Sequence, residues 1–134
     1  MSRVLVDSNV LLDVLTRDPT WIEWSAGALA SIAEAHTLVI NPIIYSEVSV
    51  GFHRIEEVDA QLPANVFRRE PLPWSAGFLA GKAFMRYRRK GGARRSPLPD
   101  FYIGAHASVG GMTVLTRDPT PFRHYYPRVP LITP

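Results

Sequence analysis

Short β-branched runs alternate with longer helix-like segments along this chain, and this alternation is the feature that most constrains its fold. The predicted strands are residues 3–6, 37–40, part of 66–72, 112–115 and 129–132. The predicted helices are residues 10–15, 21–35, 43–53, 55–62, 75–90 and 101–109. Such alternation is typical of an α/β fold with a mainly parallel central sheet, here of about five strands, and helices on both faces.

The length of 134 residues fits a single domain, expected to span residues 1–134, because domains typically have about 100–200 residues. Cysteine is absent, which excludes disulfides, cysteine-ligated metals and a thiol nucleophile. The apolar runs fall far short of the ~20 residues that span a bilayer, and the first residues lack the apolar core of a signal peptide. These features lead us to expect a cytoplasmic protein.

The chain carries 15 Lys and Arg against 12 Asp and Glu, a net charge of +3 that hints at a polyanionic partner. Much of the positive charge lies in residues 82–95, and no acid occurs between Glu70 and Asp100. The candidate phosphate-binding residues of this segment are Lys82, Arg86, Arg89, Arg94 and Arg95. A solvated helix face is the ordinary interpretation, but we favour phosphate contact because the run has one sign and adjoins Asp100.

Four acids occupy positions that suit a ligand site. Asp7 and Asp118 follow the strands 3–6 and 112–115, at the carboxyl edge of the predicted sheet, where ligands bind. Glu47 and Asp100 are predicted on helices, with mainly apolar residues three and four positions away. Simpler roles stay open, since Asp7 and Asp100 could be helix N-caps and Asp118 a turn residue. Glu47 is harder to explain that way, because an unpaired carboxylate on an apolar face is costly.

Inward-facing carboxylates without basic partners repel one another and resist ionisation. A divalent cation removes this conflict, and oxygen ligands suit Mg²⁺, with Mn²⁺ as a substitute. Such an ion activates water and offsets charge in phosphodiester cleavage. The four acids together therefore predict a metal site.

The segment 14–20 recurs identically as 114–120, with the sequence VLTRDPT in both places. The flanking sequences differ, and no period of a structural repeat is visible. The first copy is predicted to end a helix and the second to end a strand. We interpret the match as coincidence, in which Asp-Pro-Thr provides turn chemistry twice.

Four segments in this order resemble the PIN domain family, and within it the VapC-type toxins of toxin–antitoxin systems. They are residues 4–12, 45–48, 99–107 and 115–122, and the resemblance covers nearly the whole chain. The resemblance implies a three-layer PIN-like sandwich and a Mg²⁺- or Mn²⁺-dependent endoribonuclease acting as a toxin. Its catalytic and metal-binding acids correspond to Asp7, Glu47, Asp100 and Asp118. Asn9 and Thr116 match polar positions that would hold the carboxylates or a water.

The resemblance also implies an RNA substrate, a homodimer and a cognate antitoxin protein. We expect Asp7, Asp100 and Asp118 to bind a catalytic ion, and Glu47 to bind a second ion or orient water. Two alternatives remain: a housekeeping RNA-processing nuclease, and a non-catalytic PIN module that binds RNA or a partner. A dehalogenase-type phosphoaspartate enzyme is disfavoured because its second Asp would stand at position 9, which is Asn. A receiver domain is disfavoured because no acidic pair precedes the first strand.

Overall fold

The computed structural model describes residues 2–94 and 98–134 and contains one five-stranded sheet in which every pair of neighbouring strands is parallel. The strand order is β3-β2-β1-β4-β5. The strands are β1 (Arg3–Val6), β2 (Thr37–Ile40), β3 (Phe67–Arg69), β4 (Thr113–Leu115) and β5 (Leu131–Ile132). The predicted α/β class with a parallel sheet is confirmed.

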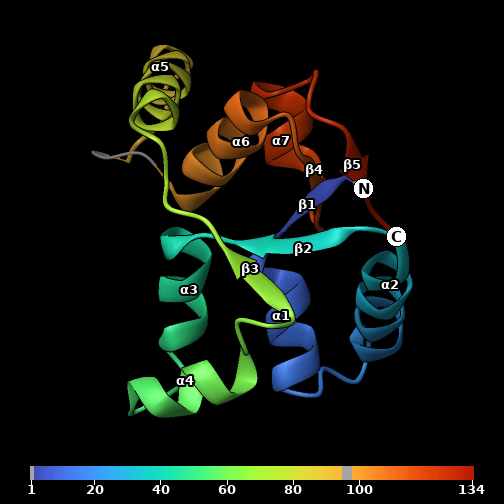
Figure 1. Ribbon diagram of the computed structural model, residues 1–134. Helices are drawn as coiled ribbons and strands as arrows, with labels where there is room; N and C mark the ends of the chain where they lie inside the picture. Colours follow the sequence, from blue (N-terminus) through green and yellow to red (C-terminus); the bar gives the residue numbers. More distant parts are fainter. Residues whose placement is uncertain (1, 95–97) are drawn as a thin grey trace.

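Helices cover both faces of the sheet (Figure 1). They are α1 (Ser8–Leu15), α2 (Ile22–Ala35), α3 (Pro42–Ser49), α4 (Ile55–Gln61), α5 (Trp74–Arg89), α6 (Pro99–Gly110) and α7 (Thr120–Tyr125). The first four lie on one side of the sheet and the last three on the other (Figure 1). The predicted three-layer arrangement is therefore confirmed, and among the described residues no helix is long and apolar enough to cross a membrane.

The core explains why the two central strands are so apolar. Val4, Leu5 and Val6 of β1 are at most 2% exposed, because helices cover both faces of this strand. On α5, the predicted inward face of Ala76, Ala80 and Ala83 is fully buried. These small side chains let α5 lie close against α6, which brings the basic helix beside the start of α6.

Two elements differ from the sequence prediction. Helix α3 ends at Ser49 rather than continuing to residue 53, and Val50 is left 86% exposed. Helix α7 was not predicted; its N-cap is Pro119, its first turn holds Pro121, and the sequence interpretation gave Asp-Pro-Thr only as turn chemistry. Proline is tolerated in the first helical turn, whose N–H groups have no partner within the helix, so the two prolines begin α7 rather than prevent it.

Candidate active site

The ends of β1 and β4 are joined directly, and this places the first and last of the four predicted acids on the same edge of the sheet. The backbone N–H of Asp7 donates to the carbonyl of Leu115 over 2.9 Å. Residue 7 therefore lies beside residues 116–118, although more than a hundred residues separate them along the chain.

Thr116 connects the two strand ends through its hydroxyl group. The fully buried hydroxyl donates to Asp7 Oδ2 at 2.8 Å and accepts the backbone N–H of Asp118 at 3.0 Å. It is also 3.3 Å from Asn9 Nδ2, while Asn9 Oδ1 accepts the backbone N–H of Arg117. Thr116 thus contacts Asp7 directly, and Asn9 contacts Thr116 and Arg117, while the carboxylate-holding role that the resemblance implies for both stays a prediction.

Glu47 reaches the same region from α3. Its carboxylate is half-buried and accepts a 3.0 Å hydrogen bond from the hydroxyl of Ser8, the residue after Asp7. The expected apolar surroundings hold for Ile44, which is fully buried, but Gly51 is exposed because α3 has already ended. Glu47 therefore lies at the border between core and solvent.

Asp100 and Asp118 complete the set. Asp100 is half-buried in the first turn of α6, and Asp118 is exposed in the loop after β4. The helix N-cap alternative holds for Asp7 by position alone and fails for Asp100. The side chain of Asp7 does not cap α1, and the N-cap of α6 is Leu98.

Burial and mutual repulsion shift the pKa values of these carboxyl groups. Burial raises the pKa of Asp7 from its ordinary 3.8 to about 7, against the opposing hydrogen bond from Thr116, and the charges of Asp100 and Glu47 raise it further. Burial, followed by the charges of Glu47 and Asp118, raises the pKa of Asp100 to about 6. Burial also raises the pKa of Glu47, and the bond from Ser8 opposes this. A raised pKa of a carboxyl group means that its negative charge is not balanced by a nearby cation.

The donor chemistry of this cluster fits a hard divalent cation. The four side chains offer carboxylate oxygens alone, which Mg²⁺ and Mn²⁺ prefer. In the described part of the chain, no three His, Cys, Asp or Glu side chains lie close enough together to form a ready-made metal site. The structure therefore shows acids that repel one another across a shared space.

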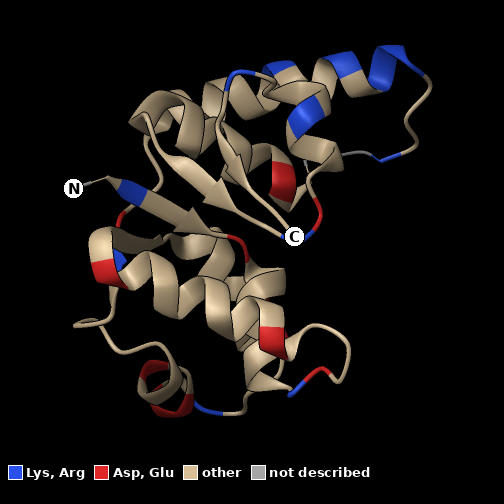
Figure 2. Cartoon of the chain, turned by 90° about the vertical axis from the view of Figure 1, so that its right-hand side faces the viewer, with Lys and Arg blue, Asp and Glu red and all other residues tan. Residues whose placement is uncertain are grey.

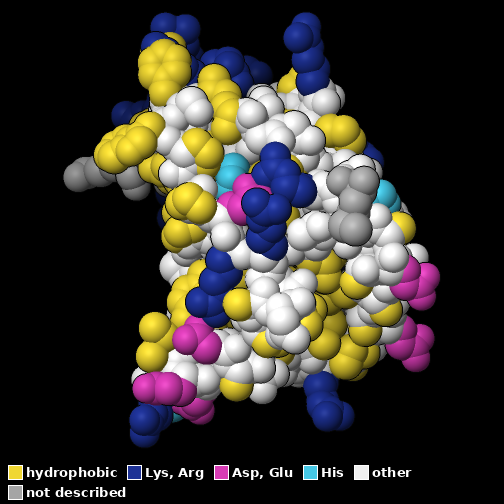
Figure 3. Space-filling model, viewed as in Figure 1, with side chains coloured by type: hydrophobic (Ala, Val, Ile, Leu, Met, Phe, Trp, Pro, Cys, Tyr) yellow, Lys and Arg dark blue, Asp and Glu magenta, His cyan; other side chains and the backbone are white. Residues whose placement is uncertain are grey.

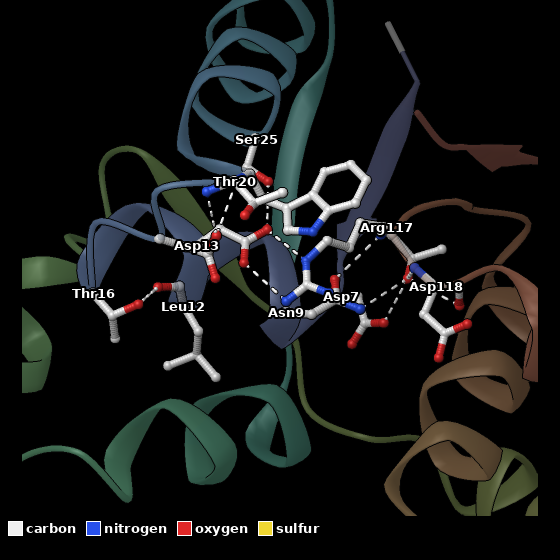
Figure 4. Close-up of polar contacts among 12 residues, drawn as sticks. Asp7, Asn9, Leu12, Asp13, Thr16, Thr20, Ser25, Arg117 and Asp118 are labelled. Carbon is white, nitrogen blue, oxygen red and sulfur yellow. Dashed lines mark hydrogen bonds and ion pairs between the residues drawn. The ribbon is translucent and has the colours of Figure 1, made fainter.

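A buried ion pair beside the site was missed from the sequence (Figure 4). Arg117 binds Asp13 through two hydrogen bonds of 2.8 and 3.0 Å, and Asp13, only 2% exposed, also accepts from Ser25 Oγ at 2.7 Å. The guanidinium lies 5.6 Å from the centre of the Trp21 ring. Asp13 shares a helix face with buried Val10, three residues earlier, so the face test applied to Glu47 would have found it.

This pair ties the strand end that carries Thr116 and Asp118 to α1 and α2. It also occupies the guanidinium of Arg117, whose neighbour in the chain is Asp118. The one arginine in the 116–118 loop is thus turned toward Asp13 rather than toward the acids of the cluster.

The predicted basic residues are placed in part. Lys82, Arg86 and Arg89 are exposed along α5, where Lys and Arg gather at the top of Figure 2. Arg86 also donates to the Tyr125 carbonyl at 3.1 Å, which joins α5 to the end of α7. Arg94 is exposed in the loop after α5, whereas Arg95 lies outside the described residues.

His106 has a packing role away from the acids. It is buried on α6, with Nδ1 at 3.0 Å from Asn41 Nδ2 and Nε2 at 3.8 Å from Glu70 Oε1. Burial lowers the pKa of His106. Glu70 forms an ion pair with Arg3. Figure 3 shows basic, acidic and histidine side chains together at the centre of the face seen in the view of Figure 1.

Comparison with known proteins agrees with this architecture. The structure is similar to the VapBC2 complex from Rickettsia felis bound to a promoter DNA fragment, with a TM-score of 0.74, 18% identity and 98% of each chain covered. It is similar to VapBC-1 from nontypeable Haemophilus influenzae, with a TM-score of 0.71, 16% identity and coverage of 98% and 97%. It is also similar to DNA-bound VapBC from Salmonella typhimurium, with a TM-score of 0.71, 18% identity and coverage of 99% of this chain and 98% of that chain.

A search of curated protein sequences finds no significant match. The sequence model of the PIN domain matches residues 4–126, a span that holds all four acids and both of their polar neighbours. The chain belongs to the PIN domain family.

Proposed function

We propose that this chain is a divalent-metal-dependent endoribonuclease that hydrolyses RNA phosphodiester bonds as the toxin of a toxin–antitoxin pair. The observation that carries the proposal is that the four carboxylates lie near enough for their charges to act on one another in pairs. Within residues 2–94 and 98–134, none of the four forms an ion pair, and the pKa values of Asp7 and Asp100 are about 7 and about 6. A cluster that destabilises itself at neutral pH without an ion is suited to binding one.

In this proposal Asp7, Asp100 and Asp118 hold the ion, and Glu47 holds a second ion or orients a water. A divalent cation, when bound, supplies activation of water at neutral pH and offsets negative charge on a phosphate. The chain's own residues fix the donors. Thr116 orients the Asp7 carboxylate and favours its ionised form, and Ser8 does the same for Glu47.

The basic residues provide the attraction for a polyanion. Lys82, Arg86, Arg89 and Arg94 are exposed on or beside α5, and α5 lies against α6, which begins next to Asp100. Contacts of this kind give affinity that depends on salt and little on sequence. They favour a nucleic acid as substrate, and RNA is our proposal within that class.

The partners follow from the structural neighbours. The similar structures are toxin–antitoxin complexes, so we propose that a cognate antitoxin binds this chain. The homodimer is a further proposal that rests on the family resemblance. A small DNA-binding protein encoded beside this chain would support the toxin role. A gene without such a neighbour would favour an RNA-processing nuclease instead.

The test is cleavage of single-stranded RNA by the purified protein with Mg²⁺, with Mn²⁺ and with EDTA. Asp118→Asn should lower the rate by at least about 100-fold, because residues that merely support metal ligands already cost 10- to 100-fold when removed. The matched control is Asp18→Asn, in the other copy of VLTRDPT, which should keep the wild-type rate. Full activity in EDTA, or in Asp118→Asn, would contradict the proposal.

The role in cells needs a second experiment. Inducible expression, followed by sequencing of new RNA 5′ ends, should reveal cleavage sites for the wild type and none for Asp7→Asn. Growth arrest relieved by co-expression of the neighbouring gene would support the toxin. Discrete cleavage without growth arrest would favour the processing nuclease.

A further inference from the structure

A pocket of about 320 Å³ opens directly beside two of the four acids. It lies between α5, α6 and α7, the three helices on one side of the sheet (Figure 1). Its lining includes Asp100 and Asp118 at one end and Tyr87, Phe101, His124 and Tyr125 elsewhere. The pocket is therefore continuous with the candidate active site.

The aromatic part of this lining is rigid. Phe101 is 3% exposed and makes edge contacts with Tyr87 at 5.8 Å and with Tyr125 at 4.9 Å between ring centres. Tyr125 contacts His124 edge-on at 4.6 Å. Tyr87 and Tyr125 are only half-buried, so parts of both rings remain accessible to a flat ligand.

Residues around the pocket fix the positions of two of these rings, Tyr87 and Tyr125. A Cβ atom at Gly92 would overlap the Tyr87 ring, so glycine lets the loop after α5 pass close to Tyr87. Arg86 holds the carbonyl of Tyr125 at 3.1 Å and so fixes the end of α7. The aromatic walls are thus held from two sides.

The rim of the pocket is basic. Lys90 Nζ lies 3.1 Å from Nε2 of His124, a lining residue, and both side chains are exposed. Arg86 and Arg94 are exposed nearby on α5 and the loop after it. Carboxylates, aromatic rings and cations therefore all lie at or beside this one pocket.

This combination of groups matches the parts of one nucleotide, and we infer that the pocket holds the unpaired nucleobase next to the cleaved phosphate. The carboxylates serve the cation and the scissile phosphate, the rings stack on the base, and the cations contact the flanking phosphate. The volume lies at the lower end for small-ligand pockets, which suits one base rather than a base pair. The enzyme therefore selects single-stranded or looped RNA. This inference rests on the proposed function.

The test compares Tyr125→Leu with Tyr125→Phe, and uses Tyr102→Leu as the matched control. Tyr102 is a half-buried tyrosine of α6 that does not line the pocket. The probes are a single-stranded oligoribonucleotide, the same strand in a duplex, and the same strand with an abasic residue at the nucleotide flanking the cleavage site. Affinity is measured in the Asp7→Asn background with EDTA present, and kcat and KM in the wild-type background with Mg²⁺.

Tyr125→Leu should weaken binding of the intact single strand by about tenfold or more, because stacking of each base on an aromatic side chain is worth that much. Tyr125→Phe should keep most of the affinity, since its ring remains. The abasic strand should bind the wild type as weakly as the intact strand binds Tyr125→Leu, and the two changes together should cost no more than either. The duplex should bind all variants alike.

Equal loss for intact and abasic strands, or no loss for either, would overturn the inference. So would a Tyr125→Leu variant that keeps its RNA affinity but no longer binds the antitoxin, because the pocket would then hold a protein side chain. A wild-type protein that cleaves no RNA with any divalent ion would overturn the proposed function. A wild type that cleaves RNA, with KM unchanged in Tyr125→Leu, would overturn the base pocket alone.

Discussion

The same seven residues, VLTRDPT, do two different jobs at positions 14–20 and 114–120. The first copy ends α1 and turns the chain toward α2, whereas the second ends β4 and delivers side chains to the acidic cluster. The sequence interpretation, that the match is not a structural repeat, agrees with these different elements. Because the letters are identical, every difference between the copies comes from their surroundings.

The first copy closes a helix through its backbone. The N–H of Asp18 donates to the carbonyl of Asp13, and the N–H of Arg17 donates to the carbonyl of Val14, the paired bonds of a Schellman motif. Arg17 has a left-handed φ of 53° at the position where glycine is preferred. Asp18 Oδ1 then accepts the N–H groups of Thr20 and Trp21, which leads into α2.

The second copy works through its side chains. Thr116 donates to Asp7, and Arg117 pairs with buried Asp13, so two residues of this copy are held by distant parts of the chain. In the first copy, Thr16 donates to the carbonyl of Leu12 in its own helix. The comparison shows that the element before the heptapeptide determines the partners of its polar groups. After a helix they bind the local backbone, and after a strand they bind residues of the candidate site.

The largest expected effect concerns Asp7, the partner of the second copy. Its pKa is about 7 in the folded protein against an ordinary 3.8, so the folded state binds the proton more tightly. The contribution of Asp7 to the free energy of unfolding of the metal-free protein should therefore be greatest below pH 4, fall as the pH rises from 4 to 7, and stay low above 7, a change of at most about 4 kcal/mol. Asp7→Asn should be more stable than the wild type at pH 8 and similar at pH 4.

Urea denaturation in EDTA across this pH range measures the difference, and Asp18→Asn is the control in the first copy. A divalent cation should recover the lost stability of the wild type at pH 8, because binding to the folded state stabilises it. A pH slope that is the same in Asp7→Asn and the wild type would show that Asp7 is not the group responsible.

The fold could be predicted from the sequence because its signals are local. Residues 3–6 and 37–40 are short β-branched runs that end at polar residues, and both are strands with these bounds. The failures are local as well. The helix at residue 43 was extended past its true end at Ser49, and α7 was missed where Asp-Pro-Thr was interpreted as turn chemistry.

The sequence could predict the place of a site residue only where that residue directly follows a recognisable strand. Asp7 and Asp118 follow strands that the sequence marks clearly, so their shared edge of the sheet could be inferred. The pair of Asp13 with Arg117 joins residues 104 apart, and no local pattern says that the two meet. The pocket beside Tyr125 could not be predicted for the same reason. It forms only where three helices pack together, and one of these helices was not predicted.

The next effect tests the arginines of the two copies. Arg117→Ala should lower the free energy of unfolding by about 2–3 kcal/mol, because Asp13 stays buried as an unpaired carboxylate. This figure is below that of a fully buried pair because the Arg117 side chain is 30% exposed. Arg17→Ala should change stability by less than about 0.5 kcal/mol, as is usual for an exposed residue.

Denaturant midpoints of both variants measure this contrast. Combining Arg117→Ala with Asp13→Asn should recover part of the loss, because no buried charge then remains unpaired. Equal costs for Arg17→Ala and Arg117→Ala would break the comparison between the copies. A double variant less stable than Arg117→Ala alone would mean that Asp13 stabilises the fold chiefly through Ser25.

The threonines of the two copies should differ in their effect on activity. Thr116→Val removes the hydroxyl that favours the ionised form of Asp7, so its pKa rises further. The cleavage rate should fall by about tenfold, as for loss of a residue that supports a metal ligand, and its rise with pH should move to higher pH. Thr16→Val should leave the pH–rate profile unchanged. A Thr116→Val rate that is lower by the same factor at every pH would assign this hydroxyl a structural role only.

The smallest effect is also the one in which the same substitution has opposite signs in the two copies. Arg17→Gly should raise the free energy of unfolding by about 0.5–1 kcal/mol, because glycine adopts the left-handed conformation of residue 17 without the Cβ conflict that arginine meets. Arg117→Gly should destabilise the protein, because it removes the partner of Asp13 and relieves no left-handed φ. Urea denaturation of the two variants at one pH measures both signs. A destabilising Arg17→Gly would mean that the extra conformational freedom of glycine in the unfolded chain outweighs the relieved strain. The arginine would then stabilise the folded protein in both copies.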